Sequence, residues 1–387
     1  MRICIITPKL LRTDGQGRVN YEIAQHLLKQ GHEVVAVATV IEPELKGHLL
    51  WREVTLPTWV KVALGKDHFF WSQAGQAIAH ERFDIVHVNG LSYGPTDVNA
   101  CHFVHRSWLR SPYHASRHFR GSYALYQNLY SRWMARWEKQ AYQQSRRVVA
   151  ISEFVRDSLI HDVGVEPSKI TVIPNGVDRR EFRPLEPGEP NLVRTELQLS
   201  DAAFLVFFTG DITLNRKNLD LVLHALVRAA PEVHLAVVGA SQRSPYPALA
   251  QALGVRQRVH FLGQRSDVAA LLRGADCFVL PAHYDPFSLV VLEALASAVP
   301  VITAPTVGCA RFIDPGRNGL ILRHSNDLAG LVRALDGLVA DRTRARALGL
   351  AGRAVALPLS WQTMAQRYEH LYQSLAETRP LSRQHKL

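Results

Sequence analysis

Short apolar runs alternate along the chain with longer segments in which apolar residues recur every three or four positions. Residues 2–7 form the first run and predict a buried strand, and residues 19–29 then show helical spacing. Gly15 and Gly17 lie between them, where we expect a loop. Residues 33–40 predict the next strand, so this segment is a βαβ unit with parallel strands.

The same order begins again after residue 200. Further buried strands are predicted at residues 84–88, 147–152, 204–210, 233–239, 277–281 and 300–304, and a helix at 219–230. Two sets of alternating strands and helices predict two doubly wound α/β domains, 1–180 and 181–360, with a cleft between them. Residues 179–199 contain three prolines and mixed charge, which is typical of a linker.

The end of the chain changes character. Residues 361–375 have helical spacing and many polar positions, so we expect a helix that packs back across the domains. We therefore assign 361–387 to the N-terminal domain. The last ten residues are polar and basic, and we expect them to be frayed.

The composition is that of a globular protein. Of 387 residues, 47% are hydrophobic and 20% charged, which is enough to build two cores. No run reaches the roughly 18 apolar residues of a membrane-spanning helix. The first strand lacks the length and cleavage site of a signal peptide, so we expect a cytoplasmic protein. Cys4 and Cys277 lie in apolar runs as core residues, and no disulfide or zinc pattern is visible.

The charge narrows the range of partners. Lys and Arg number 45 against 34 Asp and Glu, giving a net charge of +11. This excess favours anionic partners such as nucleotides, phospholipids or nucleic acid, without choosing among them.

One segment concentrates chemistry after the strand at 277–281. Ser288 is placed to cap the apolar helix that follows, in which Glu293 is the one charged residue. A buried carboxylate needs partners, and either the hydroxyls of a bound sugar or a structural Lys or Arg would satisfy it. Asp285 lies at the strand exit, where ligands of parallel sheets bind. The amides of Ser288, Leu289 and Val290 carry the positive end of the helix dipole and suit a phosphate.

This segment, Pro281-Ala-His-Tyr-Asp-Pro-Phe-Ser-Leu-Val-Val-Leu-Glu293-Ala-Leu, resembles the E-x7-E motif of the retaining glycosyltransferases of family GT4. Four other segments align with that family in the same order across nearly the whole chain: residues 14–34, 149–157, 173–178 and 316–322. The resemblance implies a GT-B fold, in which two Rossmann-like domains face each other across a cleft and a C-terminal helix crosses back. It also implies that 1–180 binds the acceptor and 181–360 the nucleotide-sugar donor.

The resemblance assigns roles to the signature segment. Glu293 would bind the donor ribose. Asp285 takes the place of the first Glu of the motif, against the donor sugar, with a side chain one methylene shorter. Ser288 stands where the family often has Gly, and its amide would bind the donor phosphates together with those of Leu289 and Val290.

Arg216 and Lys217 resemble the family's basic pair for the donor diphosphate, which makes them candidate catalytic residues. Fixed cations stabilise the charge that the leaving diphosphate gains as the glycosidic bond breaks. The alternative is an exposed pair flanking a helix. Asn218 replaces the Gly that usually follows the Lys.

Other assignments come from the alignment alone. Gly15 and Gly17 would let the backbone approach the donor phosphates or sugar, with Asp14 in place of the first Gly of the usual pair. Arg18 is a candidate acceptor or phosphate contact. Gly263 and Arg265 lie where the family seats the nucleobase.

His102 matches the active-site His that many members carry, and it would orient or polarise the donor sugar as a catalytic residue. His105 and His87 are rival candidates for this position. Arg311 stands where the family often has Glu.

The mechanism implied is transfer with retention of anomeric configuration. No metal and no cofactor is expected, and the nucleotide-sugar, UDP- or GDP-linked, is a co-substrate. The acceptor would be a saccharide or a lipid-linked molecule, in bacterial lipopolysaccharide, exopolysaccharide or glycolipid synthesis. Alternatives are a GT-B-type sugar-nucleotide epimerase and a non-catalytic nucleotide-sugar-binding protein.

Residues 105–147 carry eight arginines, one lysine and one acid, Glu138, with Trp108, Trp133 and Trp137 interleaved. One interpretation is a surface that touches anionic lipid on the inner face of the plasma membrane. The other is an ordinary helix whose aromatic residues pack inward while the arginines are solvated. No RNA-binding motif is present, so nucleic acid is not an expected partner.

Overall fold

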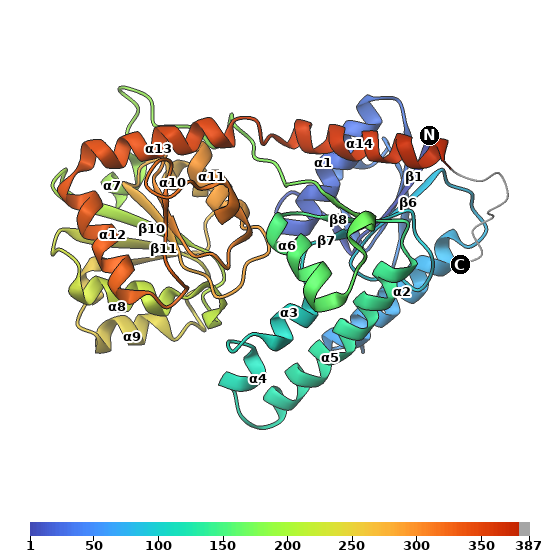
Figure 1. The fold of residues 1–387 in the computed structure, drawn as a ribbon, viewed down its shortest axis with the longest axis horizontal. Coiled ribbons are helices and arrows are strands. Elements are labelled where there is room, and N and C mark those ends of the chain that lie inside the picture. Colours follow the sequence, from blue (N-terminus) through green and yellow to red (C-terminus); the bar gives the residue numbers. More distant parts are fainter. Residues whose placement is uncertain (379–387) are drawn as a thin grey trace. The chain divides into compact units, whose positions relative to one another are not determined.

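The computed structural model describes residues 1–378 and divides the chain into two compact units of parallel sheet covered by helices (Figure 1). Unit 1 comprises residues 1–176 and the tail from Trp361, and unit 2 comprises residues 177–360. The predicted α/β fold of two doubly wound sheets is confirmed. The tail predicted to be frayed lies, from residue 379 on, outside the described residues.

Unit 1 contains, within residues 1–378, a seven-stranded sheet in the order β5-β3-β1-β6-β7-β8-β9. These strands are β1 (Arg2–Ile6), β3 (Glu33–Ala38), β5 (Leu50–Glu53), β6 (Ile85–Asn89), β7 (Val98–Cys101), β8 (Arg147–Ala150) and β9 (Ile170–Val172); β2 (Lys9–Leu10) and β4 (Val40–Ile41) pair separately. The chain leaves the central β1 on one side and returns on the other, so β1 and β6 flank the switch point where ligands of such sheets bind.

The helices of unit 1 are α1 (Gly15–Lys29), α2 (Ala63–Ile78), α3 (His105–Arg110), α4 (Ala115–His118), α5 (Gly121–Gln144), α6 (Glu153–Ser158) and α14 (Trp361–Glu377). One core packs α2 and α5 against the same face of the sheet. In it Cys4 and Val35 of the strands meet Phe70 and Trp71 of α2 and Trp137 of α5. Burying these side chains fixes both long helices against the carboxyl half of the sheet.

Unit 2 contains, in the described part of the chain, a six-stranded sheet in the order β12-β11-β10-β13-β14-β15. Its strands are β10 (Phe204–Thr209), β11 (Val233–Val238), β12 (Val259–Gly263), β13 (Cys277–Leu280), β14 (Val301–Thr303) and β15 (Leu320–Ile321). Its helices are α7 (Leu192–Glu196), α8 (Leu219–Arg228), α9 (Tyr246–Ala252), α10 (Val268–Leu272), α11 (Leu289–Ala296), α12 (Leu328–Ala340) and α13 (Arg342–Ala356). Here β10 and β13 flank the switch point. Cys277 is buried in β13, and all four cysteines are buried free thiols, as predicted for Cys4 and Cys277.

The start of α1 differs from the prediction. Gly15 and Gly17 lie in the first turn of the helix and not in a loop. Asp14 is the reason: its carboxylate accepts a hydrogen bond from the amide of Gly17 at 2.8 Å and so caps the helix four residues earlier than the apolar spacing indicates.

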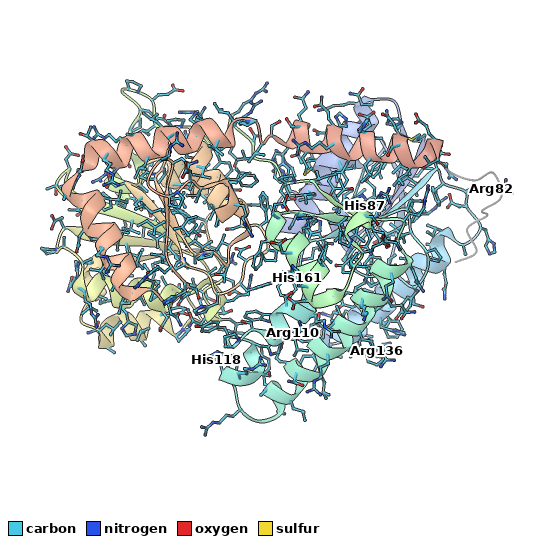
Figure 2. All side chains as sticks on the ribbon, viewed as in Figure 1. Arg82, His87, Arg110, His118, Arg136 and His161 are labelled. Atoms are coloured by element: carbon cyan, nitrogen blue, oxygen red, sulfur yellow. The ribbon has the colours of Figure 1, made fainter. Side chains whose placement is uncertain are left out.

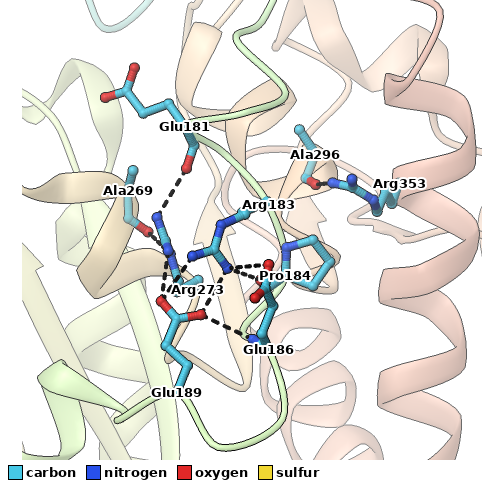
Figure 3. A network of polar contacts seen from close by, with 9 residues as sticks. All are labelled: Glu181, Arg183, Pro184, Glu186, Glu189, Ala269, Arg273, Ala296 and Arg353. Atoms are coloured by element: carbon cyan, nitrogen blue, oxygen red, sulfur yellow. Dashed lines mark hydrogen bonds and ion pairs between the residues drawn. The ribbon is translucent and has the colours of Figure 1, made fainter.

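The segment interpreted as a linker is bound to unit 2, so that prediction is wrong (Figure 3). The Glu189 carboxylate binds the guanidinium groups of Arg183 at 2.8 Å and Arg273 at 2.9 Å. Arg273 also donates to the carbonyl of Glu181 at 3.0 Å. Residues 192–196 then form α7. The proline-containing segment is docked on unit 2, because Arg273 of that unit supplies the charge that binds Glu189. The local sequence does not show this distant partner.

Helix α14 returns to unit 1 and packs on α1, which confirms the predicted returning helix. Its Glu369 carboxylate binds Nε2 of His26 at 2.7 Å and Nε2 of His32 at 2.9 Å. Burial raises the pKa of Glu369, but the contacts from His32 and His26 outweigh it and leave the pKa below its usual value. This carboxylate therefore ties α14 to α1 in its ionised form.

We expect Glu369→Gln to lower the stability of unit 1 by about 1–2 kcal/mol at pH 7, because hydrogen bonds to a charged group are lost. Since the pKa of Glu369 is lowered on folding, its contribution is present above the ordinary value of 4.5 and is lost as the pH falls through the lowered value. Calorimetric melting of wild type and variant should therefore differ at pH 7 and converge near pH 3. Glu377→Gln, on the exposed end of the same helix, is the control; an equal effect of both would contradict the prediction.

Candidate functional site

The loops that leave β10 and β13 are joined by an ion pair. Lys217, in the short 3-10 turn Asn215–Lys217 after β10, binds the carboxylate of Asp285, which follows β13. The Arg216 guanidinium donates to the carbonyl of Tyr284 at 3.1 Å, and the amide of His283 donates to the carbonyl of Arg216 at 2.9 Å. The structure thus brings three predicted site residues together at the switch point of unit 2.

Asp285 is buried, and its side chain is 8% exposed against 14% for Lys217. Burial raises the pKa of Asp285, but Lys217 and then Arg216 outweigh it, so the pKa of this carboxyl lies below its usual value. The two cations are therefore not an exposed surface pair. They face a carboxylate in a site partly shielded from water.

Asn218 explains why the chain tolerates the loss of a glycine after Lys217. It has φ of 59°, a left-handed conformation that Gly and Asn adopt more readily than other residues. Its side chain accepts from the amide of Leu221 at 3.3 Å and so caps α8. The same side chain donates to the carbonyls of Pro281 at 3.2 Å and Ser325 at 2.6 Å, which links α8 to the loop after β13.

Ser288 precedes α11, but its hydroxyl does not cap the helix, so that prediction is wrong. The residue has φ of 71°, and within residues 1–378 its buried Oγ finds no hydrogen-bond partner. The left-handed backbone turns the hydroxyl away from the amides of the first turn. Those amides, at Leu289 and Val290, precede the first intrahelical hydrogen bonds and carry the positive end of the helix dipole, as predicted.

Glu293 lies on the second turn of α11 and is partly exposed, where the sequence predicted a buried carboxylate. The thiol of Cys309 lies close enough to Asp285, Glu293 and Lys217 for all three charges to affect its pKa. Burial raises the pKa of Cys309 well above its usual value, the charges of Asp285 and Glu293 raise it further, and Lys217 opposes them. Its sulfur also contacts the carbonyl of Ser288 at 3.3 Å. Cys309 was not singled out from the sequence, because nothing in its local pattern places it beside these groups.

Gly263 ends β12 with φ of 70°, a conformation that only glycine adopts without strain. Arg265 is held in bidentate pairs by Glu196, at 2.8 and 3.0 Å, and Asp267, at 2.8 and 2.7 Å. Its guanidinium therefore joins α7 to α10. Arg311 is exposed in the turn Gly308–Phe312.

In unit 1 the two predicted glycines have different surroundings. A Cβ on Gly17 would lie 2.9 Å from the carbonyl oxygen of Leu11, so close packing of the chain itself requires this glycine. A Cβ on Gly15 would meet nothing within 4 Å. Arg18 pairs with Glu22 at 2.7 Å and lies 5.5 Å from the ring of Trp361, so it is engaged between α1 and α14.

His102 lines a cavity of about 200 Å³ at the carboxyl edge of the unit 1 sheet. Its Nε2 contacts the amide oxygen of Asn89 at 3.1 Å, and because that oxygen only accepts, the proton lies on Nε2. Burial lowers the pKa of His102 to about 4, with Asp14 opposing, so the ring is neutral at pH 7. His105 lines the same cavity, and burial lowers its pKa to about 4 as well.

His87, the third candidate, is placed differently (Figure 2). It is fully buried in β6, hydrogen-bonds the Tyr372 hydroxyl through Nδ1 and stacks on Tyr368 with ring centroids 5.5 Å apart. Burial lowers its pKa to about 3. It does not line the cavity, and its contacts fix α14 to the sheet.

Three further residues of the cavity were not predicted from the sequence. Asp67 of α2 accepts a hydrogen bond from the Tyr130 hydroxyl at 3.2 Å, and burial raises the pKa of Asp67 although that bond opposes it. Glu138 of α5 accepts from the amides of His105 at 2.9 Å and Arg106 at 3.0 Å. Burial raises its pKa to about 8, against these two hydrogen bonds. In the sequence Glu138 stands out as the single acid of a basic segment, whereas nothing in the sequence pattern points to Asp67.

In the basic, aromatic segment some aromatic residues pack inward and others are exposed. Trp137 packs inward, where its Nε1 donates to the carbonyl of Ser92 at 3.0 Å. Leu125, Leu129 and Trp133 lie on the outer face of α5 and are 62%, 55% and 57% exposed. α4 and the first turns of α5 extend away from the unit 1 sheet (Figure 1), and Figure 2 labels Arg110, His118 and Arg136 on this part of the molecule.

Two searches of the described residues bear on partners. None of the helices in residues 1–378 has the length and apolarity to cross a membrane. In the same range, no three His, Cys, Asp or Glu side chains are grouped so that they could hold a metal ion.

The sequence matches two family profiles. Residues 13–181 match Glycosyltransferase Family 4, and residues 203–341 match Glycosyl transferases group 1. Together the two matches span most of both units, and they include the segments after β1, β10 and β13 described above.

Curated relatives carry transferase or synthase names. The chain is 28% identical over 308 residues to alpha-maltose-1-phosphate synthase of Mycolicibacterium smegmatis, covering 75% of this chain and 76% of that protein. It is 31% identical over 242 residues to D-inositol 3-phosphate glycosyltransferase of Nocardia farcinica, covering 59% of this chain and 52% of that protein. The chain thus spans about half the length of the second relative.

Solved structures share the fold. WaaG, a glycosyltransferase involved in lipopolysaccharide biosynthesis, superposes with a TM-score of 0.79 at 19% identity, over 96% of this chain and 99% of that one. HepE of Anabaena in complex with UDP-glucose gives 0.71 at 18% identity, over 97% and 100%. At these identities the likeness establishes the architecture, which is GT-B as predicted.

We expect Ser288→Gly to stabilise unit 2 by about 1–2 kcal/mol, because it removes left-handed strain and an unpaired buried hydroxyl. Ser288→Ala removes the hydroxyl but keeps the strain, so its gain should be smaller. Melting temperatures measured by calorimetry would test the order Gly above Ala above wild type. A glycine variant that melts below wild type would refute the strain assignment.

Proposed function

We propose that this chain transfers a sugar from a nucleotide-diphosphate donor to an acceptor hydroxyl with retention of configuration. The chain belongs to the family 4 glycosyltransferases, whose profile matches its first unit, while the group 1 profile matches its second. The observation that carries this proposal is the meeting of Arg216, Lys217 and the α11 N-terminus at the switch point of unit 2. The relatives are named for synthesis or transfer, which does not favour an epimerase.

In this proposal unit 2 binds the donor. Arg216, Lys217 and the amides at the start of α11 hold the diphosphate, and Glu293 binds the ribose hydroxyls. Without donor, Lys217 is neutralised by Asp285. An arriving diphosphate competes for Lys217, which frees the Asp285 carboxylate to accept hydrogen bonds from the donor sugar.

The reaction exchanges one bond at the anomeric carbon for another. The bond to the diphosphate oxygen breaks, and the acceptor oxygen bonds to the same face of that carbon. The acceptor proton passes to the departing phosphate oxygen, so no separate base is needed. Arg216 and Lys217 stabilise the charge that develops on the diphosphate, which is electrostatic catalysis of the kind a divalent metal provides elsewhere. We therefore propose a transferase that requires no metal and no cofactor.

Unit 1 would supply His102 and bind the acceptor. With its proton on Nε2 toward Asn89, the neutral ring presents a lone pair at Nδ1, which suits orienting a sugar hydroxyl and not nucleophilic attack. Arg18, engaged with Glu22 and Trp361, would position α1 and not touch the acceptor.

UDP- and GDP-sugars are the proposed donors. The HepE structure holds UDP-glucose, which supports a uridine nucleotide. The base would contact the backbone at Gly263, because the Arg265 guanidinium already binds two carboxylates. The acceptor would be a saccharide or a lipid-linked molecule of the bacterial envelope, a pathway supported by the fold shared with WaaG.

A membrane contact is a further part of the proposal. Leu125, Leu129 and Trp133 recur every four residues and form one apolar stripe on α5, beside the exposed Arg132 and Arg136. An apolar stripe flanked by arginines suits the headgroup region of anionic lipid. We propose that this stripe seats the protein on the cytoplasmic face of the plasma membrane.

Lys217→Ala and Glu293→Ala are each expected to lower kcat/KM by about 10²–10³, since donor charge or ribose binding is lost. The assay is release of nucleoside diphosphate with a donor that raises the melting temperature of the wild type. Lys29→Ala and Glu186→Ala, at exposed positions, are the matched controls.

Because Lys217→Ala leaves Asp285 buried without its main partner, this variant can also lose stability. The double variant Lys217→Ala with Asp285→Asn removes both charges and should melt closer to wild type while staying inactive. Turnover near wild type in Glu293→Ala, or in the double variant, would rule out the donor assignment.

Charge reversal on α5 tests the membrane contact. Arg132→Glu with Arg136→Glu should reduce sedimentation with anionic vesicles by at least about tenfold, because each basic residue near such a surface contributes about 1 kcal/mol. Arg317→Glu with Arg346→Glu changes the net charge equally on unit 2 and serves as control. Equal losses of vesicle binding in both variants, or no vesicle binding of the wild type at low salt, would rule out the α5 stripe as a membrane-binding surface.

A further inference from the structure

The cavity beside His102 differs in charge from the site around Lys217 and Asp285 in unit 2. Among its polar lining residues are Gln16, Asp67, Asn89, Tyr130 and Glu138, with Trp71 and Met134 as apolar walls. None of the lining residues, all within residues 1–378, is a lysine or arginine. In a chain with a net charge of +11, a ligand-sized cavity without a fixed cation is a specific feature.

The two histidines of the cavity do not supply a positive charge. Burial lowers the pKa of His102 and of His105 to about 4, so both rings are neutral at pH 7. Arg106 contributes its backbone amide to Glu138, but its side chain does not line the cavity. An anionic group placed here would meet the carboxylate of Asp67 without a compensating cation, which is unfavourable at short range.

The same lining suits hydroxyl groups. The Asp67 carboxylate accepts hydrogen bonds, and the amide group of Gln16 can both donate and accept. The amide group of Asn89 is already bonded to Ile6, Asn20 and His102 and serves to hold the His102 ring. Trp71 and Met134 give the cavity apolar lining, against which a sugar ring can pack its C–H groups. A volume of 200 Å³ equals that of about six or seven water molecules, which suits a single ring.

We propose that this cavity binds one uncharged saccharide ring of the acceptor and rejects a phosphorylated ring, with Asp67 as the selecting residue. The proposal rests on the transfer function and specifies its acceptor class. It separates this chain from relatives whose names specify inositol 3-phosphate or maltose 1-phosphate. It also places the acceptor beside His102, in unit 1.

The test is binding of paired ligands to the full chain in the presence of UDP, measured by saturation-transfer difference NMR titration. The pairs are methyl α-glucoside with glucose 6-phosphate, and myo-inositol with inositol 3-phosphate. The uncharged member should bind at least about tenfold more tightly than its phosphorylated partner, the ratio expected from one buried charge-assisted contact. Asp67→Asn should weaken binding of the uncharged ligand by a similar factor. It should also bring the ratio of the two dissociation constants closer to one.

Two controls make the result specific. Asp157→Asn changes a half-exposed carboxylate elsewhere in unit 1 and should leave both dissociation constants unchanged. Tyr130→Phe keeps the Asp67 carboxyl group but removes the hydrogen bond that opposes the rise of its pKa, so it should still prefer the uncharged ligand, by a smaller ratio than wild type. Comparing dodecyl glucoside with methyl glucoside distinguishes two acceptor sources. A glycolipid acceptor predicts tighter binding of dodecyl glucoside because of its alkyl chain, and a free-sugar acceptor predicts equal binding of the two.

Tighter binding of the phosphorylated member, no binding of any uncharged ring, or an unchanged ratio in Asp67→Asn would each overturn the proposal. These outcomes are separate from failure of the transfer function. That failure would appear as the absence of any thermal shift with UDP- and GDP-sugars, a measurement that depends on unit 2 and not on Asp67.

Discussion

A buried ion pair between Lys217 and Asp285 holds together the two loops that diverge from β10 and β13. Each charge alone would be costly to remove from water, and each is tolerated because the other is there. Around the pair, Arg216 binds the carbonyl of Tyr284, and Asn218 binds that of Pro281. The positions of the α11 amides and of Glu293 follow from this arrangement, because the loop after β13 leads directly into that helix. In the proposed function, donor binding thus begins from a site whose cation is already in place.

The two units divide the charge of the molecule in opposite ways. At the switch point of unit 2, the cations Arg216 and Lys217 and a helix N-terminus lie beside the carboxylate of Asp285. At the switch point of unit 1, a cavity contains the Asp67 carboxylate, neutral histidines and Glu138, whose pKa burial raises to about 8, so that its carboxyl group is largely uncharged at pH 7. A net charge of +11 therefore describes neither site. This division matches the proposed reaction, in which one substrate is a diphosphate and the other presents hydroxyl groups, since only the unit 2 site offers cations to a diphosphate.

Periodicity predicted the helices at 219–230 and 361–375 and most of the central strands, because burial in parallel sheets depends on local apolar runs. It missed the short strands β5, β7, β9 and β15. Features that depend on distant partners could not be predicted in this way. The docking of residues 179–191 needs Arg273, and the cavity needs Asp67 and Tyr130 from helices far apart in the chain. The failed Ser288 cap has a third cause: a serine in a left-handed conformation carries no sign of it in the sequence. Family resemblance brought Arg216, Lys217 and Asp285 into one site, and the ion pair between them was still unforeseen.

The departures from the family pattern have physical consequences that can be ordered. Asn218 changes little, because asparagine adopts the left-handed backbone that glycine would and adds a helix cap. Ser288 keeps the backbone amide at a cost in strain. Asp285 changes most: its carboxylate binds Lys217, so in the proposed function the donor diphosphate exchanges one anionic partner of that lysine for another. The free energy of this exchange is spent when the donor binds, so it subtracts equally from the donor complex and from the transition state that follows. In this scheme Asp285 raises KM and leaves kcat unchanged, because the barrier between the donor complex and the transition state does not include the exchange.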